Sequence, residues 1–368
     1  MSETLDAAVV GAGAVGLAVA ARLARPGRTV AVLERHPRHG LETSSRSSEV
    51  IHAGLYYPAD SLKARLCVEG RRRLYEWMEA GLLPARKTGK LVVARDDSER
   101  PALEALLARG RGNGAGELTA VEGRDLPRFA EGVRGAAALW SPETGVMDTE
   151  ALMALYRKRA EDGGALFAFG TELEGVSRKD GAYELKLKGH REPVRARAVV
   201  NAAGLSADAV AASAGLDVDA LGYRIHWFKG EYFSLKSVLP PKCLVYPLPG
   251  AHGLGVHLTL DLAGRQRLGP NAFPVDRLEY GVDPAHGDAF FEAAKLLLPG
   301  LKRDDLRPGT SGIRPKLSAG PEFRDFVVRE ESGRGLPGWV NLLGIDSPGL
   351  TASPAIAALV GDVLEWPA

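Results

Sequence analysis

The feature that most constrains this chain is a glycine triplet close to its N-terminus. Gly11, Gly13 and Gly16 lie between an apolar stretch, Ala7–Ala12, and a helical pattern over Ala14–Arg25. In this spacing the first glycine makes the turn out of a strand, the second lets the backbone approach a pyrophosphate, and the third lets helix and strand pack closely. The free N–H groups at the helix start then face the diphosphate. The segment therefore predicts a Rossmann-like strand–helix–strand unit that binds an adenine dinucleotide.

Glu34 strengthens this interpretation. It ends a second apolar strand, Thr29–Glu34, about twenty residues after the glycines, where an acidic side chain can bind a ribose hydroxyl. Ala14 and Val15 at the helix start, and Arg35 after the second strand, are further expected cofactor contacts. The alternative, an ordinary turn of small residues, explains neither the strand before the glycines nor the acid after them.

Composition and charge narrow the function classes. Of the 368 residues, 45% are hydrophobic and 25% are charged, and the formal net charge is +1. These values are ordinary for a globular enzyme with one large core or two interleaved domains. A chain of such balanced charge does not favour a nucleic-acid partner, and we expect none. Cys67 and Cys243 lack metal-ligand spacing, so we expect reduced thiols and no metal site.

The hydropathy pattern predicts no integral membrane segment, because no apolar run approaches the roughly 20 residues that span a bilayer. The apolar stretch near the N-terminus follows an acidic leader, residues 1–6, whereas a signal peptide begins with a basic one. We therefore predict a cytoplasmic protein. The run Arg71–Arg73 leaves docking at the inner face of the membrane as an alternative, although a solvated helix face also explains it.

The element patterns predict an α/β fold in which a second domain interrupts the nucleotide-binding one. We expect a long helix over Ser61–Gly81, a hairpin turning at Lys179–Gly181 and an all-β region from Tyr223 to Pro274. The tract Gly110–Gly116 lacks the spacing of the first glycine loop and is predicted to be a surface loop. We assign residues 1–85, 145–220 and 305–368 to the Rossmann-like cofactor domain, and residues 86–144 and 221–304 to an inserted, β-sheet-rich α+β substrate domain.

Eight short motifs extend from the first part of the chain to its end. They are Ser44–Tyr57, Ser61–Ala64, Asn201–Gly204, Phe228–Tyr232, Gly255–Thr259, Gly269–Ala272, Gly312–Arg314 and Ser347–Thr351. Together they resemble the D-amino-acid-oxidase-like superfamily of flavoproteins, most closely its L-2-hydroxyglutarate dehydrogenase/oxidase branch. The resemblance implies non-covalent FAD and a β-sheet substrate domain. Two departures bear on substrate choice: the family often has a glycine where this chain has Glu49, and an arginine where it has Lys229.

The resemblance extends the expected cofactor contacts beyond the glycine loop. Hydroxyl groups and Arg46 in the segment after the second strand suit phosphate or flavin, although a solvated serine-rich turn is the alternative. The N–H groups that open the last helix would stabilise negative charge on the flavin N1–C2=O edge. The further residues assigned to the cofactor are Thr43, Ser44, Ser45, Arg46, Val50, His52, Val176, Ala202, Ala203, Gly204, Gly312, Arg314, Ser347, Pro348, Gly349, Leu350 and Thr351.

Five residues are candidates for the chemistry. Oxidation of an alcohol requires a base for the hydroxyl proton, and a histidine accepts a proton near neutral pH. His52 is the preferred base and His257 the second candidate, and the sequence does not decide between them. Arg314 is expected to bind a substrate carboxylate. Lys229 and Tyr246 are weaker candidates for the other end of the substrate.

These assignments predict an FAD-dependent oxidoreductase. A second glycine fingerprint for a nicotinamide cofactor is absent from the sequence, so the electrons are expected to come from the organic substrate. The leading hypothesis is oxidation of a small 2-hydroxy acid by hydride transfer to flavin N5, with electrons passed to quinone or oxygen. The alternatives are oxidation of an amino acid, an N-methylamino acid or glycerol 3-phosphate, and a flavin-binding protein without turnover. The exact substrate, its stereochemistry and the oligomeric state are left open.

Overall fold

The computed structural model describes residues 4–249 and 255–366, which form two compact units. Unit 1 comprises residues 1–45, 149–226 and 314–368, and unit 2 comprises residues 46–148 and 227–313. Residues 46–85 thus belong to unit 2, whereas the sequence assigns them to the cofactor domain. Compactness does not reveal which residues touch a cofactor, so that assignment stays a prediction. The outermost residues of the predicted cofactor domain and residues 250–254 of the predicted substrate domain lie outside the described residues.

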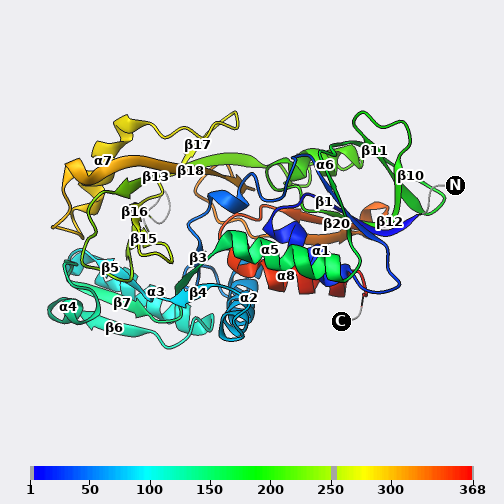
Figure 1. Cartoon of the computed structure of the whole chain (residues 1–368). Helices are drawn as coiled ribbons and strands as arrows, with labels where there is room; N and C mark the ends of the chain where they lie inside the picture. The colour runs from blue at the N-terminus through cyan, green and yellow to red at the C-terminus, as the bar shows by residue number, and fades with distance from the viewer. Residues whose placement is uncertain (1–3, 250–254, 367–368) are drawn as a thin grey trace. The chain divides into compact units, whose positions relative to one another are not determined.

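An eight-stranded sheet forms the centre of unit 1 (Figure 1). Its strands are β1 (Leu5–Val10), β2 (Val30–Glu34), β9 (Leu166–Phe169), β10 (Leu173–Lys179), β11 (Ala182–Leu187), β12 (Val194–Asn201), β19 (Val327–Glu331) and β20 (Leu336–Leu343). Parallel pairing runs through β9, β2, β1, β12 and β20. Because Ala7–Val10 of β1 and Val30–Leu33 of β2 are apolar and buried, both faces of the sheet must be covered, as parallel sheets require.

Helices supply that cover in unit 1. They are α1 (Ala14–Leu23), α5 (Thr149–Asp162), α6 (Ala207–Ser213) and α8 (Gly349–Val363), with the 3₁₀ helices η1 (Ser44–Arg46, which begins in unit 1 and ends in unit 2), η4 (Gly204–Ser206) and η7 (Ser332–Arg334). Helix α1 contacts both α5 and α8, and Figure 1 shows α6 on the opposite face of the sheet. On the α6 face, Val210 packs against the cluster that contains Ala8 and Val10.

Unit 2 is built on a nine-stranded sheet and a three-stranded one. The larger contains β5 (Lys90–Ala94), β6 (Thr119–Glu122), β7 (Ala137–Ser141), β13 (His226–Leu235), β14 (Leu244–Pro247), β15 (Leu258–Leu260), β16 (Gln266–Leu268), β17 (Phe273–Pro274) and β18 (Leu306–Lys316). The smaller contains β3 (Val50–Ile51), β4 (Ala85–Lys87) and β8 (Gly145–Met147). The first residue of β13 and the last residues of β18 belong to unit 1.

Both faces of the larger sheet are apolar. On β5, Leu91 and Val93 join a cluster with α7, whereas Val92 and Ala94 join a cluster with α3 on the other face. The helical elements of unit 2 are α2 (Leu62–Glu79), α3 (Arg100–Gly112), α4 (Leu126–Phe129), α7 (Gly287–Ala294), η2 (Asp97–Glu99), η3 (Gly123–Asp125), η5 (Pro284–His286) and η6 (Arg303–Asp305).

Two expectations for unit 2 are wrong in part. The first residues of the tract Gly110–Gly116 belong to α3, which ends at Gly112, and Gly110 is packed, because a Cβ there would meet Leu118 and Leu55 at 2.6 and 2.8 Å. Gly114, in a turn, and Gly116, just after it, are exposed, as the sequence predicts. The run Arg71–Arg73 is not wholly solvated: Arg71 is 4% exposed and donates a 2.9 Å hydrogen bond to the carbonyl oxygen of Ala53. A buried guanidinium that is bonded in this way holds α2 against the segment that follows β3 and is not available to a membrane.

Candidate functional site

A cavity of about 320 Å³ lies in unit 1 at the carboxyl ends of β1, β2 and β12. This volume is typical of small-molecule sites, and the carboxyl ends of parallel strands are where such sites form. The cavity is lined by Val10, Gly11, Gly13, Leu33, Glu34, Arg35, His36, Gly40, Leu41, Glu42, Thr43, Ser44, Thr171, Glu172, Leu173, Glu174, Ala202, Ala203, Gly204, Leu205, Ser206, Ala209, Val210 and Ser213. We call it the nucleotide pocket.

The glycine loop has the geometry that a dinucleotide requires. Gly11 has φ +103°, and a Cβ there would lie 2.6 Å from the carbonyl oxygen of Ala202. A Cβ on Gly16 would overlap the carbonyl oxygen of Gly11, so α1 can approach β1 only with glycine at this position. Gly13 faces the pocket, where Ser44 Oγ accepts a 2.9 Å hydrogen bond from the Ala14 N–H. The loop therefore has the close strand–helix approach that a dinucleotide-binding turn requires, while the N–H groups of Ala12 and Ala14 are bonded to Glu34 and Ser44.

Glu34 is the buried acid of the pocket. Its side chain is 8% exposed, and one oxygen, Oε2, accepts a 2.7 Å bond from the Ala12 N–H. The other oxygen, Oε1, accepts a 2.8 Å bond from the His36 N–H. These two bonds join the glycine loop to the end of β2 and hold the carboxylate at the position expected for a ribose ligand.

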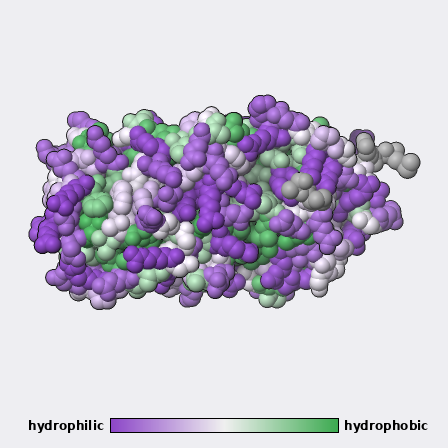
Figure 2. All heavy atoms as spheres, turned by 90° about the horizontal axis from the view of Figure 1, so that it is seen from below, coloured by the Kyte–Doolittle hydropathy of each residue, from purple (hydrophilic) through white to green (hydrophobic). Residues whose placement is uncertain are grey.

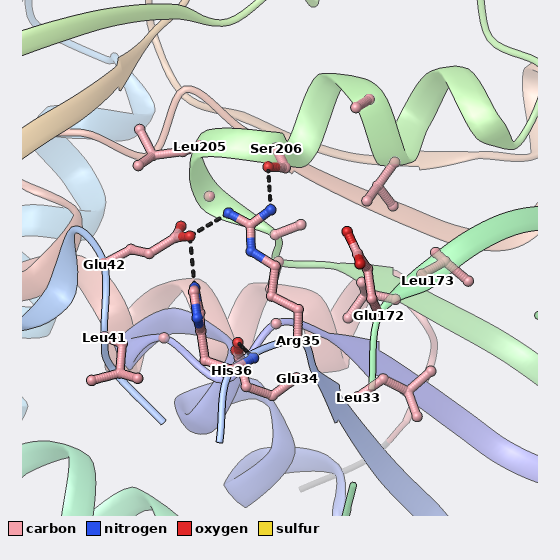
Figure 3. A pocket seen from close by; sticks show the side chains of 18 of the residues that line it. Leu33, Glu34, Arg35, His36, Leu41, Glu42, Glu172, Leu173, Leu205 and Ser206 are labelled. Carbon is pink, nitrogen blue, oxygen red and sulfur yellow. Dashed lines mark hydrogen bonds and ion pairs between the residues drawn. The ribbon is translucent and has the colours of Figure 1, made fainter. Parts of the chain in front are cut away.

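A polar network forms the rim of the pocket (Figure 3). Arg35 donates a 3.1 Å hydrogen bond to Ser206 Oγ and pairs with Glu42. Glu42 also lies 2.9 Å from His36 Nε2. The network connects the segment after β2 with the turn after β12, so two segments distant in sequence close one side of the pocket.

Some predicted cofactor residues line the pocket and others do not. Those that line it are Gly11, Gly13, Glu34, Arg35, Thr43, Ser44, Ala202, Ala203 and Gly204. Ala14, Val15 and Gly16 form the first turns of α1 behind it. Val176 does not line it: this residue pairs with Leu185 on β11 and packs on the sheet cluster, while Leu173 and Glu174 line the pocket. Sequence reasoning missed the contribution of α6, because its small residues look the same as those of any core helix.

The remaining predicted contacts fall in both units. In unit 1, Ser347 and Pro348 precede α8, which contains Gly349, Leu350 and the fully buried Thr351. Arg314, also in unit 1, is partly buried. None of these lines the nucleotide pocket. Their roles toward the flavin and the substrate stay predictions.

In unit 2, local packing explains several of the predicted residues. Ser45, which ends the first segment of unit 1, is exposed. The guanidinium of Arg46, the first residue of unit 2, lies 3.9 Å from the Tyr280 ring centroid. A Cβ on Gly312 would overlap the carbonyl oxygen of Arg46, and Val50 packs in the α3 cluster. Glu49 has φ +60°, a conformation that glycine adopts without strain, at the position where the family often has one.

The candidate bases lie in unit 2. His257 is 4% exposed, and its Nδ1 lies 2.8 Å from the Gly255 carbonyl oxygen, which can only accept. Nδ1 therefore carries the proton, and the neutral ring has its lone pair on Nε2. The imidazole stacks on Tyr246 at a centroid distance of 3.7 Å and an angle of 20°. His52 is 9% exposed, and its carbonyl oxygen accepts a 3.4 Å bond from Cys67 Sγ.

The amine of Lys229 makes ion pairs and a hydrogen bond with other residues of unit 2. Its Nζ lies 2.8 Å from Glu279 and 3.6 Å from Glu231, and it also contacts the Gly281 carbonyl oxygen. Glu231 is 1% exposed, and although burial alone would raise its pKa, its bonds to His286, Asn271 and Asp283 hold that pKa below the usual value. The charge of Lys229 is thus balanced by carboxylates, which weakens its candidacy as a substrate ligand.

No helix in residues 4–249 and 255–366 is both long and apolar enough to cross a membrane. In the same residues, no group of three or more His, Cys, Asp or Glu side chains is arranged to hold a metal ion. On the face drawn in Figure 2, hydrophilic side chains predominate and hydrophobic ones form small patches between them.

Sequence comparisons match nearly the whole chain. The family described as FAD dependent oxidoreductase (DAO) matches residues 6–363. The L-2-hydroxyglutarate dehydrogenase, mitochondrial, of Arabidopsis thaliana is 39% identical over 402 residues, covering 96% of this chain and 82% of its own length. The protein of the same name from Caenorhabditis elegans is 31% identical over 400 residues, covering 96% of this chain and 92% of its own length.

Solved structures agree on the fold. An L-alpha-glycerophosphate oxidase from Mycoplasma pneumoniae, solved with FAD bound, has a TM-score of 0.89 and 25% identity, covering 99% of this chain and 96% of its own. A glycine oxidase from Geobacillus kaustophilus has a TM-score of 0.79 and 21% identity, covering 99% and 95%, a likeness of fold alone. The predicted fold class is confirmed.

Proposed function

The chain belongs to the DAO family of FAD-dependent oxidoreductases, and on this premise we propose that it oxidises a small L-2-hydroxy acid of the 2-hydroxyglutarate type to the 2-oxo acid. The observation that carries the proposal is similarity along almost the whole chain to relatives named L-2-hydroxyglutarate dehydrogenase. A shared fold alone would not single out a substrate. Full-length similarity at this level includes the substrate-facing elements.

Unit 1 supplies the cofactor-binding part of the proposal. FAD, when bound, provides the two-electron acceptor for the oxidation. The glycine loop and Glu34 would hold its diphosphate and ribose, and the rim network of Arg35 and Glu42 would enclose its adenosine half. The predicted role of the α8 start toward the flavin is part of this proposal.

Unit 2 supplies the proton acceptor. We assign this role first to His257, because its hydrogen bond to Gly255 leaves the lone pair on Nε2 and the stack on Tyr246 fixes the ring plane. A ring held in one tautomer and one plane can accept the hydroxyl proton without reorienting. His52 is the second candidate. Arg314 is the proposed ligand of the carboxylate next to the reacting carbon, since a guanidinium binds a carboxylate through two parallel hydrogen bonds.

An anaerobic panel tests the proposal. The FAD-loaded protein is mixed with L- and D-2-hydroxyglutarate, other 2-hydroxy acids, amino acids, N-methylamino acids and glycerol 3-phosphate, and the oxidised flavin absorbance is followed. We expect L-2-hydroxyglutarate to bleach the flavin fastest. Bleaching by amines alone would overturn the proposal.

Glycerol 3-phosphate is the second candidate substrate, favoured by the likeness to the Mycoplasma pneumoniae oxidase. It belongs in the same panel because it too is an alcohol that needs a base. We propose quinone or oxygen as the final electron acceptor. Oxygen consumption and reduction of a soluble quinone, measured with the best substrate, distinguish these two. The cytoplasmic location stays a prediction.

A further inference from the structure

One lysine of unit 2 has no role in the reaction proposed above. Lys90, the first residue of β5, is completely buried. By the alternation of the strand its side chain lies on the same face as Val92 and Ala94, where the α3 cluster packs. A lysine that starts a strand usually extends its amine to solvent. This one places its amine in an apolar cluster.

Two tyrosines form a cage around the amine. Lys90 Nζ lies 4.7 Å from the ring centroid of Tyr56 and 4.7 Å from that of Tyr246. Neither Lys90 Nζ nor the buried Tyr56 hydroxyl has a hydrogen-bond partner among the described residues. The aromatic faces offset part of the desolvation cost of a cation, but a buried donor without an acceptor still costs free energy. Two such donors in one cage point to an acceptor that arrives from outside.

No ion pair with a carboxylate is found for this amine in the part of unit 2 that the structure describes, residues 46–148, 227–249 and 255–313. The thiol of Cys67 interacts with it, but burial raises the pKa of Cys67 to about 12, so that group is neutral. Burial lowers the pKa of Lys90 to about 7. Lys229 is the opposite case, since it is buried with two carboxylates in contact. The amine of Lys90 is therefore positioned to become charged when an anion enters the cage.

We propose that Lys90 and the Tyr56 hydroxyl form a carboxylate-binding subsite that takes the second carboxylate of a 2-hydroxy diacid. Tyr246 is shared: its ring contacts the Lys90 amine and stacks on His257. The Lys90 amine and the His257 imidazole thus contact the same ring, which brings the subsite next to the proposed base. Both donors are buried, so the carboxylate enters only when surrounding side chains move. This inference rests on the proposed function and deepens it, because it selects diacids over monoacids.

The kinetic test compares a diacid with a monoacid of equal chain length. Lys90→Met keeps the length of the side chain and removes the charge. We expect it to raise the KM for L-2-hydroxyglutarate about 10- to 100-fold, the usual loss for a hydrogen bond to a charged group. The kcat/KM for L-2-hydroxyvalerate should change less than about threefold, because that substrate has no second carboxylate. Tyr56→Phe should give a smaller KM effect in the same direction. Equal losses on both substrates would show a structural role and overturn the subsite.

Lys87→Met is the matched control. Lys87 lies 4.6 Å from the Tyr75 ring centroid, so it also contacts an aromatic ring, but its side chain is 40% exposed and pairs with Glu143. We expect unchanged kinetics for both acids. If Lys87→Met had as large an effect as Lys90→Met, the loss of any positive charge would explain both results. That outcome would overturn the subsite.

An equilibrium test separates the subsite from the reaction. Glutarate lacks the hydroxyl group and cannot be oxidised, so its binding to the FAD-loaded protein, measured by calorimetry, does not depend on turnover. We expect Lys90→Met to weaken glutarate binding about 10-fold or more, and valerate binding hardly at all. If the wild-type protein bleaches with neither hydroxy acid but this difference holds, the proposed function fails and the subsite stands. Equal glutarate binding by both proteins overturns the subsite whatever the substrate is.

Proton uptake gives a signature that a structural role would not produce. Near pH 8 the amine of the free protein is mostly neutral, and pairing with a carboxylate raises its pKa, so binding takes up protons. Calorimetry of glutarate binding in two buffers of different ionisation enthalpy should show uptake for the wild type and none for Lys90→Met. Absence of uptake in the wild type contradicts the assignment.

Discussion

The nucleotide pocket of unit 1 and the lysine–tyrosine cage of unit 2 both contain polar groups inside the protein. They differ in whether those groups have hydrogen-bond or ion-pair partners. In the pocket the charged side chains already have partners: Glu34 accepts two backbone N–H groups, and Arg35 pairs with Glu42. In the cage, Lys90 Nζ and the Tyr56 hydroxyl have none among the described residues. We infer that a pocket for a resident cofactor has its charged groups paired within the chain, whereas the proposed substrate subsite leaves its donors open for the substrate.

We expect the largest effect from a substitution in the glycine loop of the nucleotide pocket. Gly16→Val places side-chain atoms on the carbonyl oxygen of Gly11 and forces α1 away from β1. Because the obstacle is backbone, the loop cannot relax, and we expect protein without bound FAD and with a lower thermal unfolding midpoint. Flavin absorbance after reconstitution and a thermal melt measure both. Gly333→Ala is the control in unit 1, since a Cβ there meets nothing within 4 Å. A yellow Gly16→Val protein of normal stability would contradict the assignment.

The next largest effect concerns His257, the proposed base, whose ring stacks on Tyr246 of the cage. His257→Gln should lower kcat for the hydroxy acid by a factor of about 10² to 10⁴, the usual contribution of a general base, while FAD binding stays unchanged. His52→Gln should lose less. Stopped-flow flavin reduction in both variants decides between them. A loss confined to His52→Gln would move the base to His52, and small losses in both would favour an amine substrate.

The unpaired amine predicts a pH-dependent stability. The pKa of Lys90 is about 7 in the folded protein, against 10.5 for an ordinary lysine. Between these values the unfolded chain binds more protons, so the cost of burying Lys90 is complete below pH 7 and declines as the pH rises toward 10.5. Lys90→Met should therefore raise the free energy of unfolding by a few kcal/mol at about pH 6 and by clearly less at about pH 9. Urea unfolding of both proteins measures this difference. A gain that is equal at both pH values would contradict a neutral amine.

The smallest effect compares two carboxylates of the same pocket. Glu34→Gln keeps the shape but leaves one backbone N–H facing an amide donor, so we expect the Kd for FAD to rise about 10- to 100-fold. Glu42→Gln weakens a partly exposed pair with Arg35, which should cost less than about fivefold. Flavin fluorescence titration of the apoprotein gives both constants. Equal effects would show that the rim matters as much as the buried acid.

Sequence reasoning succeeded where local chemistry decides the structure. The glycine loop, the long helix with Ser61 as its N-cap and the hairpin are all present as expected. The hairpin turns at Asp180 and Gly181, which have φ values of +50° and +78°, and Asp and Gly are the residues that such a turn prefers. Each of these features depends on residues that are close together in the chain.

It failed where partners from distant segments override local preference. Strand β18 carries Pro308, Gly309 and Pro315, which discourage a strand, yet it pairs with β13. Gly110 lies in the last turn of α3 instead of a loop, because Leu55 and Leu118 fill the space beside it. The cage could not be predicted from the sequence. A lysine before an apolar run is typical of an exposed strand end, and Tyr56 and Tyr246 come from distant parts of the chain.

The order of strands in unit 1 also has a consequence for protein synthesis. β1 pairs with β12, β12 pairs with β20, and α1 contacts α8. The glycine loop is therefore synthesised early, and every residue that lines the pocket has been synthesised once Ser213 has been added. The sheet and helix layer beneath it stay incomplete until the last part of the chain follows. We therefore expect stable capture of the flavin nucleotide only after α8 has been synthesised and has packed against α1.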